Sequence, residues 1–106
     1  MFILDYGIRT ARECVTDGIA AMAREIQSPV WFATGDALSW AESANDYVER
    51  YLGTAPDDES ADMALSEMWD TGSEYLYATT GLHAVEDCYS GGLHFLTDAE
   101  LEVWSD

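Results

Sequence analysis

Apolar residues recur at helical spacing through the first half of the chain. From Thr10 to about Gln27 they fall three or four positions apart, as on one face of an amphipathic helix. The dipeptide Ser28-Pro29 then ends this helix, because the residue before a proline disfavours helical backbone. A second stripe of the same kind begins at Asp36, the expected N-cap, and ends at Gly53.

A third helix is predicted from about Asp58 to Trp69, with acidic residues in its first turn that complement the helix dipole. After Gly72 the pattern becomes that of strands. Residues 74–79 and 82–89 predict two strands, which a tight turn at Thr80-Gly81 joins. The chain thus changes from helices to strands about two thirds of the way along.

The C-terminal part predicts one more strand and a short helix. Ser90-Gly91-Gly92 leads into a strand over 93–96, and Thr97 with Glu100 forms a capping box that opens the last helix. Residues 2–6 predict a further short strand. Three helices followed by an antiparallel β-meander and a short C-terminal helix make an α+β fold, and residues 1–106 form one acidic domain without repeats or linkers.

Charge is distributed unevenly along this chain. It has 21 Asp and Glu against four Arg, no lysine, and a formal net charge of −17. Seventeen of the acids lie in residues 36–106, where Arg50 is the only arginine. Such a field repels nucleic acid and anionic membranes and attracts basic protein surfaces. We therefore expect no direct binding of nucleic acid, and a basic nucleic-acid-binding protein as the partner.

Acidic residues of the second predicted helix are spaced to share one face. Glu42, Asp46 and Glu49 stand at i, i+4 and i+7, opposite the apolar stripe. Four helical residues advance about 6 Å, nearly twice the roughly 3.4 Å between phosphates along one DNA strand. The candidate partner-binding residues are this ladder and the acids that follow it: Glu42, Asp46, Glu49, Asp57, Asp58, Glu59, Asp62, Glu67, Asp70, Glu74, Glu86 and Asp87.

Two simpler explanations of the acidity stand beside this one. A carboxylate on a soluble helix is ordinarily just solvated surface, and an excess of acid is also typical of proteins adapted to a salt-rich cytoplasm. The second explanation predicts acid over the whole surface. Residues 1–35 carry four acids against three arginines, so the imbalance is concentrated in the remainder of the chain.

The tripeptide Asp70-Thr71-Gly72 resembles the signature of aspartic proteases, whose active site pairs two aspartates that share a proton. A homodimer of this chain would supply such a pair. That family folds almost entirely as β-structure, however, whereas the residues before Asp70 predict three helices. We therefore interpret the tripeptide as a turn at a helix exit. A small hydrolase that uses Asp70 remains an alternative function.

No other catalytic or metal-binding pattern is complete. The set His83, Glu86, Asp87 and His94 matches no ligand spacing of a known metal motif. Neither cysteine has a neighbouring histidine or basic residue that would activate its thiol. We expect no enzymatic activity, no cofactor and no metal.

The remaining expectations concern the environment of the chain. It shows no basic leader and no apolar run of membrane-spanning length, which predicts a cytoplasmic protein that does not bind membranes, either monomeric or homodimeric. Aromatic residues are frequent, and Trp40, Trp69 and Trp104 lie in or beside apolar stripes. We expect all three tryptophans in the core.

In size, charge and the lack of catalytic residues, the chain resembles the small acidic proteins of phages that imitate DNA, a class that includes anti-CRISPR and anti-restriction inhibitors. The resemblance covers the whole chain but no diagnostic motif. It implies inhibition by occlusion, in which carboxylates occupy the lysines and arginines of a bacterial defence complex and block its target DNA. Anti-CRISPR activity is the favoured form. The alternative is an antitoxin-like or other regulatory module that binds a basic protein.

Overall fold

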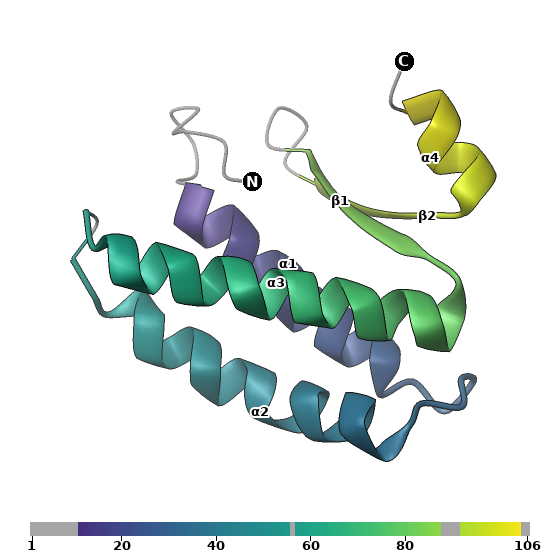
Figure 1. Cartoon of the computed structure of the whole chain (residues 1–106), viewed down its shortest axis with the longest axis horizontal. Coiled ribbons are helices and arrows are strands. Elements are labelled where there is room, and N and C mark those ends of the chain that lie inside the picture. The colour runs from purple at the N-terminus through teal and green to yellow at the C-terminus, as the bar shows by residue number, and fades with distance from the viewer. Residues whose placement is uncertain (1–10, 56, 88–91, 105–106) are drawn as a thin grey trace.

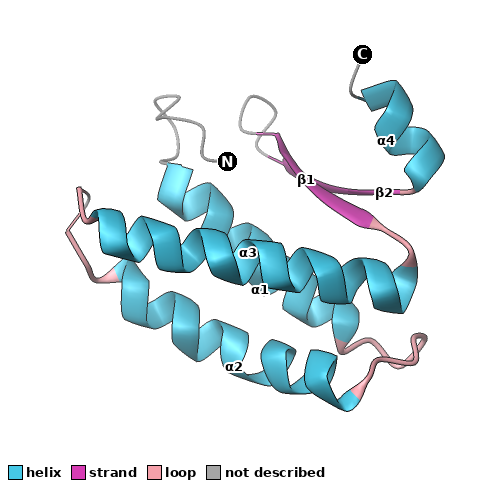
Figure 2. Ribbon diagram, viewed as in Figure 1, coloured by secondary structure: helices cyan, strands magenta, loops and turns pink. Residues whose placement is uncertain are grey.

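The computed structural model describes residues 11–55, 57–87 and 92–104 (Figure 1). They form a mostly helical α+β fold, as the sequence predicts: three helices, an antiparallel two-stranded hairpin and a short C-terminal helix (Figure 2). The strand expected at residues 2–6 lies outside the described residues. The elements are α1 (Ala11–Ile26), α2 (Gly35–Leu52), α3 (Glu59–Thr80), β1 (His83–Asp87), β2 (Gly92–Leu96) and α4 (Asp98–Trp104).

The core lies among the three long helices. Helix α1 packs against both α2 and α3, more extensively than these two pack against each other, and α2 runs antiparallel to α3 (Figure 1). The apolar stripes predicted for the first two helices are the buried faces of α1 and α2. The largest fully buried side chains are Ile19, Met22, Ile26, Leu65, Leu76 and Cys14.

Two tryptophan rings pack directly onto glycine backbones of a neighbouring helix. Trp69 of α3 covers Gly18 of α1, and Trp40 of α2 covers Gly72 of α3. A Cβ atom at either glycine would overlap the ring that covers it, so neither position accommodates a side chain without displacing its tryptophan. The ring of Trp40 also lies 6.3 Å from that of Tyr75. These contacts set how closely α3 approaches α1 and α2.

Helix α3 is longer than the sequence predicts, and the expectations for residues 70–79 are wrong. The helix does not end at about Trp69, Asp70-Thr71-Gly72 is not a turn at its exit, and residues 74–79 continue the helix rather than forming a strand. The reason is tertiary packing: Leu65, Gly72 and Leu76 fall at helical spacing on one buried face. The helix ends at Gly81, whose φ of 76° is left-handed, so Thr80-Gly81 is a helix C-cap and not a hairpin turn.

The start of α2 also differs from the prediction, because Thr34 and not Asp36 is its N-cap. Thr34 has extended backbone and its hydroxyl oxygen accepts a hydrogen bond from the Ala37 amide at 3.1 Å. Asp36 lies in the first turn of the helix, where its carboxylate complements the helix dipole. The predicted end at Gly53 is confirmed.

The predicted three-stranded meander is a two-stranded hairpin in the part of the chain that the structure describes. Strands β1 and β2 pair antiparallel, with His83 opposite Leu96 and Ala84 opposite Phe95. Ala84 and Phe95 pack against the helical core, so the hairpin covers one side of the helices. The capping box is confirmed: the Glu100 amide donates to the Thr97 hydroxyl at 3.3 Å, and the Thr97 amide donates to the Glu100 carboxylate at 3.0 Å.

We predict that Gly72→Ala destabilises the protein. Alanine favours a helix interior by roughly 1 kcal/mol over glycine, but its methyl group overlaps the Trp40 ring and forces the packing apart. We expect the free energy of unfolding, measured by urea denaturation, to fall by about 2 kcal/mol. Gly35, in the first turn of α2, has open space around it, so Gly35→Ala serves as the control and changes stability by less than about 0.5 kcal/mol. Equal stability of the two variants would contradict this account of the packing.

Candidate protein-binding surface

Helix α2 presents its acidic ladder to solvent. Glu42, Asp46 and Glu49 are all exposed, on the face opposite the buried residues of the same helix. Buried residues occur along this helix from Ala37 to Val48, so packing holds its backbone in place. The backbone positions from which these three side chains extend are therefore fixed. The predicted spacing along one helical face therefore holds in the folded chain.

Helix α3, which contacts α2, carries a second row of carboxylates. Glu67, Asp70 and Glu74 stand at i, i+3 and i+7 and are exposed, opposite the face that holds Leu65 and Leu76. This helix contains no arginine or lysine. We call the exposed carboxylates of both helices, Glu42, Asp46, Glu49, Glu67, Asp70 and Glu74, the α2–α3 acidic surface.

Two tyrosines of α2, Tyr47 and Tyr51, pack with their ring centres 5.1 Å apart. Tyr47 of α2 has its pKa raised, first by a hydrogen bond with Tyr51, then by burial, and also by the negative charge of Glu67 on α3. The Arg50 guanidinium carbon lies 5.7 Å from the centre of the Tyr47 ring and acts in the opposite direction. Glu67 is therefore close enough to α2 for its charge to be felt there. Arg50 is the only arginine on these two helices.

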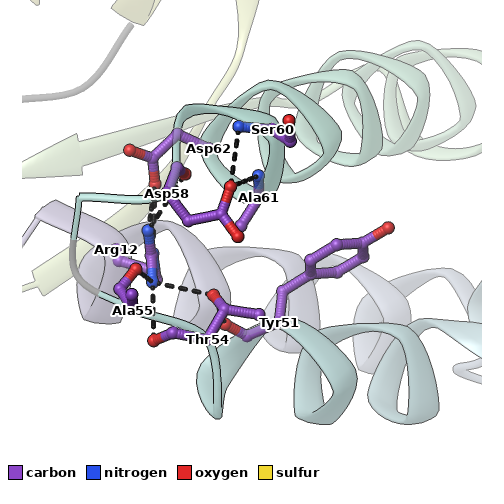
Figure 3. A network of polar contacts seen from close by, with 8 residues as sticks. All are labelled: Arg12, Tyr51, Thr54, Ala55, Asp58, Ser60, Ala61 and Asp62. Atoms are coloured by element: carbon purple, nitrogen blue, oxygen red, sulfur yellow. Dashed lines mark hydrogen bonds and ion pairs between the residues drawn. The ribbon is translucent and has the colours of Figure 1, made fainter.

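Two of the predicted contact residues, Asp58 and Asp62, have structural partners (Figure 3). The Asp58 carboxylate accepts hydrogen bonds from the Ser60 and Ala61 amides and so caps α3. Asp62 receives the Arg12 guanidinium from α1, with Nε at 3.0 Å and Nη2 at 2.9 Å from the same oxygen. The fold uses both charges, which reduces what they offer to a partner.

The same arginine holds the loop between α2 and α3 (Figure 3). Arg12 Nη1 donates to the Ala55 carbonyl at 2.9 Å and to the Thr54 hydroxyl at 3.0 Å, and Nη2 donates to the Asp58 carbonyl at 3.4 Å. Its side chain is only 11% exposed. One guanidinium thus fixes the start of α1, the end of α2 and the start of α3 relative to one another.

The other predicted residues lie around this network or on the hairpin. Asp57 and Glu59 flank Asp58 and are exposed. A shallow depression on α3 is lined by Glu59, Asp62, Met63, Ser66 and Glu67, and this links the start of α3 to the acidic surface. Glu86 and Asp87 belong to β1, which contacts α1 and α3. Glu86 is partly buried, so it is a weaker candidate for a contact than the helical acids.

Sequence reasoning missed a polar cluster that joins the C-terminal helix to the helical core. Asp98, at the start of α4, accepts a hydrogen bond from the Tyr77 hydroxyl at 2.9 Å, and its other oxygen lies 2.6 Å from Nε2 of His83. The rings of Tyr77 and His83 are stacked with centres 4.7 Å apart. The three residues come from α3, β1 and α4, and no local pattern indicates that they meet.

The other candidate catalytic and metal-binding residues do not form a site in the part of the chain that the structure describes. Asp70-Thr71-Gly72 is a stretch of helix in the middle of α3, with Asp70 exposed and Gly72 buried beneath Trp40. No group of three or more metal-ligating side chains occurs among the described residues. In the same part of the chain, no helix is both long and apolar enough to span a bilayer.

The tryptophans follow the prediction only in part. Trp40 is buried, and Trp69 is partly buried and packs against the core. Trp104 is 46% exposed, which contradicts its expected place in the core. Helix α4 lies at the edge of the molecule and contacts β2, where the ring of His94 lies 5.0 Å from that of Trp104 (Figure 1).

We predict that Arg12→Met lowers the free energy of unfolding by about 2 kcal/mol, because it leaves Asp62 and the loop carbonyls without their donor. Arg12→Lys keeps the charge but lacks the planar fork, so it should recover less than half of the loss. Arg24→Gln removes the same charge from an exposed position of α1 and should change stability by less than about 0.5 kcal/mol. Urea denaturation of the three variants is the measurement, and full rescue by lysine would show that charge alone matters.

A second prediction concerns acid pH. Hydrogen bonds from His83 and then Tyr77 lower the pKa of Asp98 below its ordinary value of 3.8. A carboxyl whose pKa is lower in the folded state stabilises it above its unfolded pKa and ceases to do so as pH falls through the folded pKa. As pH falls below 3.8 and through the lower pKa of folded Asp98, α4 should therefore lose this attachment. The loss should be seen as lower protection of the amide hydrogens of residues 98–104, relative to their intrinsic exchange rates at each pH.

In Asp98→Asn, the amide hydrogens of α4 should be less protected already at neutral pH. Their protection should also change much less when the pH is lowered. Glu100→Gln is the matched control, because the pKa of Glu100 is lowered by the amide and hydroxyl of Thr97, the residue just before α4, and not by Tyr77 or His83. That variant should fray the helix start without separating Tyr77 from His83. Acid-dependent exchange in α4 that is identical in Asp98→Asn and the parent chain would contradict the role given to Asp98.

Comparison with protein-family models, with curated proteins and with solved structures found no match to this chain.

Proposed function

We propose that this chain is a DNA-mimicking inhibitor that binds the DNA-binding surface of a bacterial defence complex and blocks access of target DNA, with a CRISPR surveillance complex as the favoured target. One observation carries the proposal. Two neighbouring helices, fixed by their packing, expose the carboxylates of the α2–α3 acidic surface, where Arg50 is the only opposing arginine.

Rigidity distinguishes this surface from an acidic tail. Each carboxylate is attached to a helix whose opposite face is buried, and the connection between the helices is held by Arg12. Binding therefore orders only the ends of side chains and not a flexible segment, which lowers its entropic cost. A partner could therefore recognise the positions of these carboxylates as well as their charge.

Inhibition needs no covalent chemistry in this mechanism. Lysines and arginines that hold DNA phosphates would pair with the acidic surface instead, and the two ligands would compete for the same cations. Long-range attraction between the −17 chain and a basic surface raises the rate of association. Affinity should fall steeply as salt concentration rises, because screening acts on every pair.

Two alternatives remain distinguishable from this proposal. An antitoxin-like or other regulatory module uses the same electrostatics on a basic protein that does not bind DNA, so DNA would not compete with it. A hydrolase that uses Asp70 would need that carboxylate in a water-excluding site, and the exposed position of Asp70 on α3 does not favour it.

We predict that the chain displaces fluorescent target DNA from at least one purified CRISPR surveillance complex or restriction enzyme, measured by anisotropy at increasing salt. Replacement of Glu42, Asp46 and Glu49 by Gln, Asn and Gln should weaken this displacement at least ten-fold and reduce its dependence on salt. The charge change is small enough, at exposed positions, to leave the fold intact.

The matched control carries the same change of three charges on other elements: Glu13→Gln and Asp17→Asn on α1 with Glu102→Gln on α4, all exposed. It should retain most of the activity. Equal loss in both triple variants would mean that net charge and not the α2–α3 surface is recognised. Failure of every complex to release DNA, or tight binding that DNA does not reverse, would overturn the proposed function.

A further inference from the structure

The connection between α1 and α2 exposes an aromatic side chain almost completely. Phe32 is 99% exposed and Val30, two residues earlier, is 70% exposed. Burying a side chain of this kind is worth about 1.5 to 3 kcal/mol, so a fully exposed phenylalanine leaves that stabilisation unused in the isolated chain. A fully exposed aromatic side chain is a candidate contact, because a few aromatic anchors supply much of the binding energy of protein interfaces.

The two residues that flank Phe32 contact the rest of the protein. Trp31 is held inward, because its indole N–H donates to the Glu25 carboxylate at 3.0 Å, and Ala33 packs against the core. Residues 32 and 33 lie outside regular secondary structure, and Thr34 has extended backbone. Both neighbours of Phe32 contact the protein, whereas Phe32 itself is left in solvent.

The loop is also fixed at both ends. The Ser28 amide donates to the Glu25 carbonyl at 3.1 Å and the Trp31 amide to the Ser28 carbonyl at 3.2 Å, which continues α1 as a turn. On the other side, Thr34 caps α2. Phe32 is thus presented on a well-connected segment rather than on a loose loop, so little conformational entropy is lost when a partner covers it.

Charge decides what kind of molecule can cover this side chain. A second copy of the chain brings another −17, and an anionic lipid surface is repelled in the same way. A basic protein is attracted, and Phe32 lies just before α2, the helix whose exposed face carries Glu42, Asp46 and Glu49. Phe32 therefore lies on the N-terminal side of the helix that would bring a basic partner to the molecule.

We propose that Phe32 is an apolar anchor, which inserts into an apolar pocket at the edge of the partner's basic surface. This inference rests on the proposed function and adds a contact that DNA itself does not make through its phosphates. The partner is consequently a basic protein with an apolar pocket beside its DNA-binding cations. Carboxylates supply a salt-sensitive part of the affinity and Phe32 a salt-resistant part.

The test uses the complex that the DNA-displacement assay identifies, and it measures the dissociation constant of the chain at several salt concentrations. Phe32→Ala should weaken binding at least ten-fold at every salt concentration while the dependence on salt stays the same, since no charge is removed. Val103→Ala, at an apolar position of α4 that is 75% exposed, is the matched control and should bind like the parent chain. Thermal unfolding should be unchanged in both variants.

The outcomes separate this inference from the proposed function. Normal binding by Phe32→Ala, with weak binding by the Glu42, Asp46 and Glu49 variant, overturns the anchor and leaves the DNA mimic standing. Absence of DNA displacement from every complex overturns both. Sedimentation of the parent chain gives a further check: self-association, or binding to zwitterionic vesicles, that Phe32→Ala abolishes would assign Phe32 to a second copy or to lipid and refute the proposed partner.

Discussion

The contact of a tryptophan ring with a glycine backbone, made twice, is the constraint on which the arrangement of this protein depends. Trp69 on Gly18 sets the approach of α3 to α1, and Trp40 on Gly72 sets that of α2 to α3. Because a ring fits there only where no Cβ is present, the three helices have little freedom to slide. The positions of the outward carboxylates follow from those of the buried rings, so the charged surface inherits its geometry from the apolar core.

The fold tolerates a large excess of negative charge by leaving most of it in solvent and using a small part of it internally. Exposed carboxylates on α2 and α3 keep their hydration, where repulsion between them is weak. Asp58 binds the free amides at the start of α3, and Asp62 takes the Arg12 guanidinium. An arginine from the nearly neutral first third of the chain thereby neutralises charge in the acidic remainder.

The sequence predicts correctly those features that depend on residues close together in the chain. The stripes of α1 and α2 and the capping box at Thr97 depend on spacings within one helix, and all three are confirmed. The length of α3 was missed, because Thr71 and Gly72 look like a helix exit until a tryptophan from another helix covers the glycine. The partners of Asp62 and Asp98 could not be predicted either. Arg12 is 50 residues from Asp62 in sequence, and His83 and Tyr77 are 15 and 21 residues from Asp98. The acidic face of α2 was predictable, whereas the outward direction of Phe32 required its neighbours' contacts.

The placement of α1 in the middle of the core has a consequence for synthesis of the chain on the ribosome. Helix α1 leaves the ribosome first, with Ile19, Met22 and Ile26 uncovered, yet Trp69, which covers Gly18, is made 51 residues later. At about 5 to 20 residues per second this interval lasts roughly 3 to 10 seconds. During that time the growing polypeptide acquires the acids of α2 and the loop after it, whose mutual repulsion keeps nascent copies apart until the core can close.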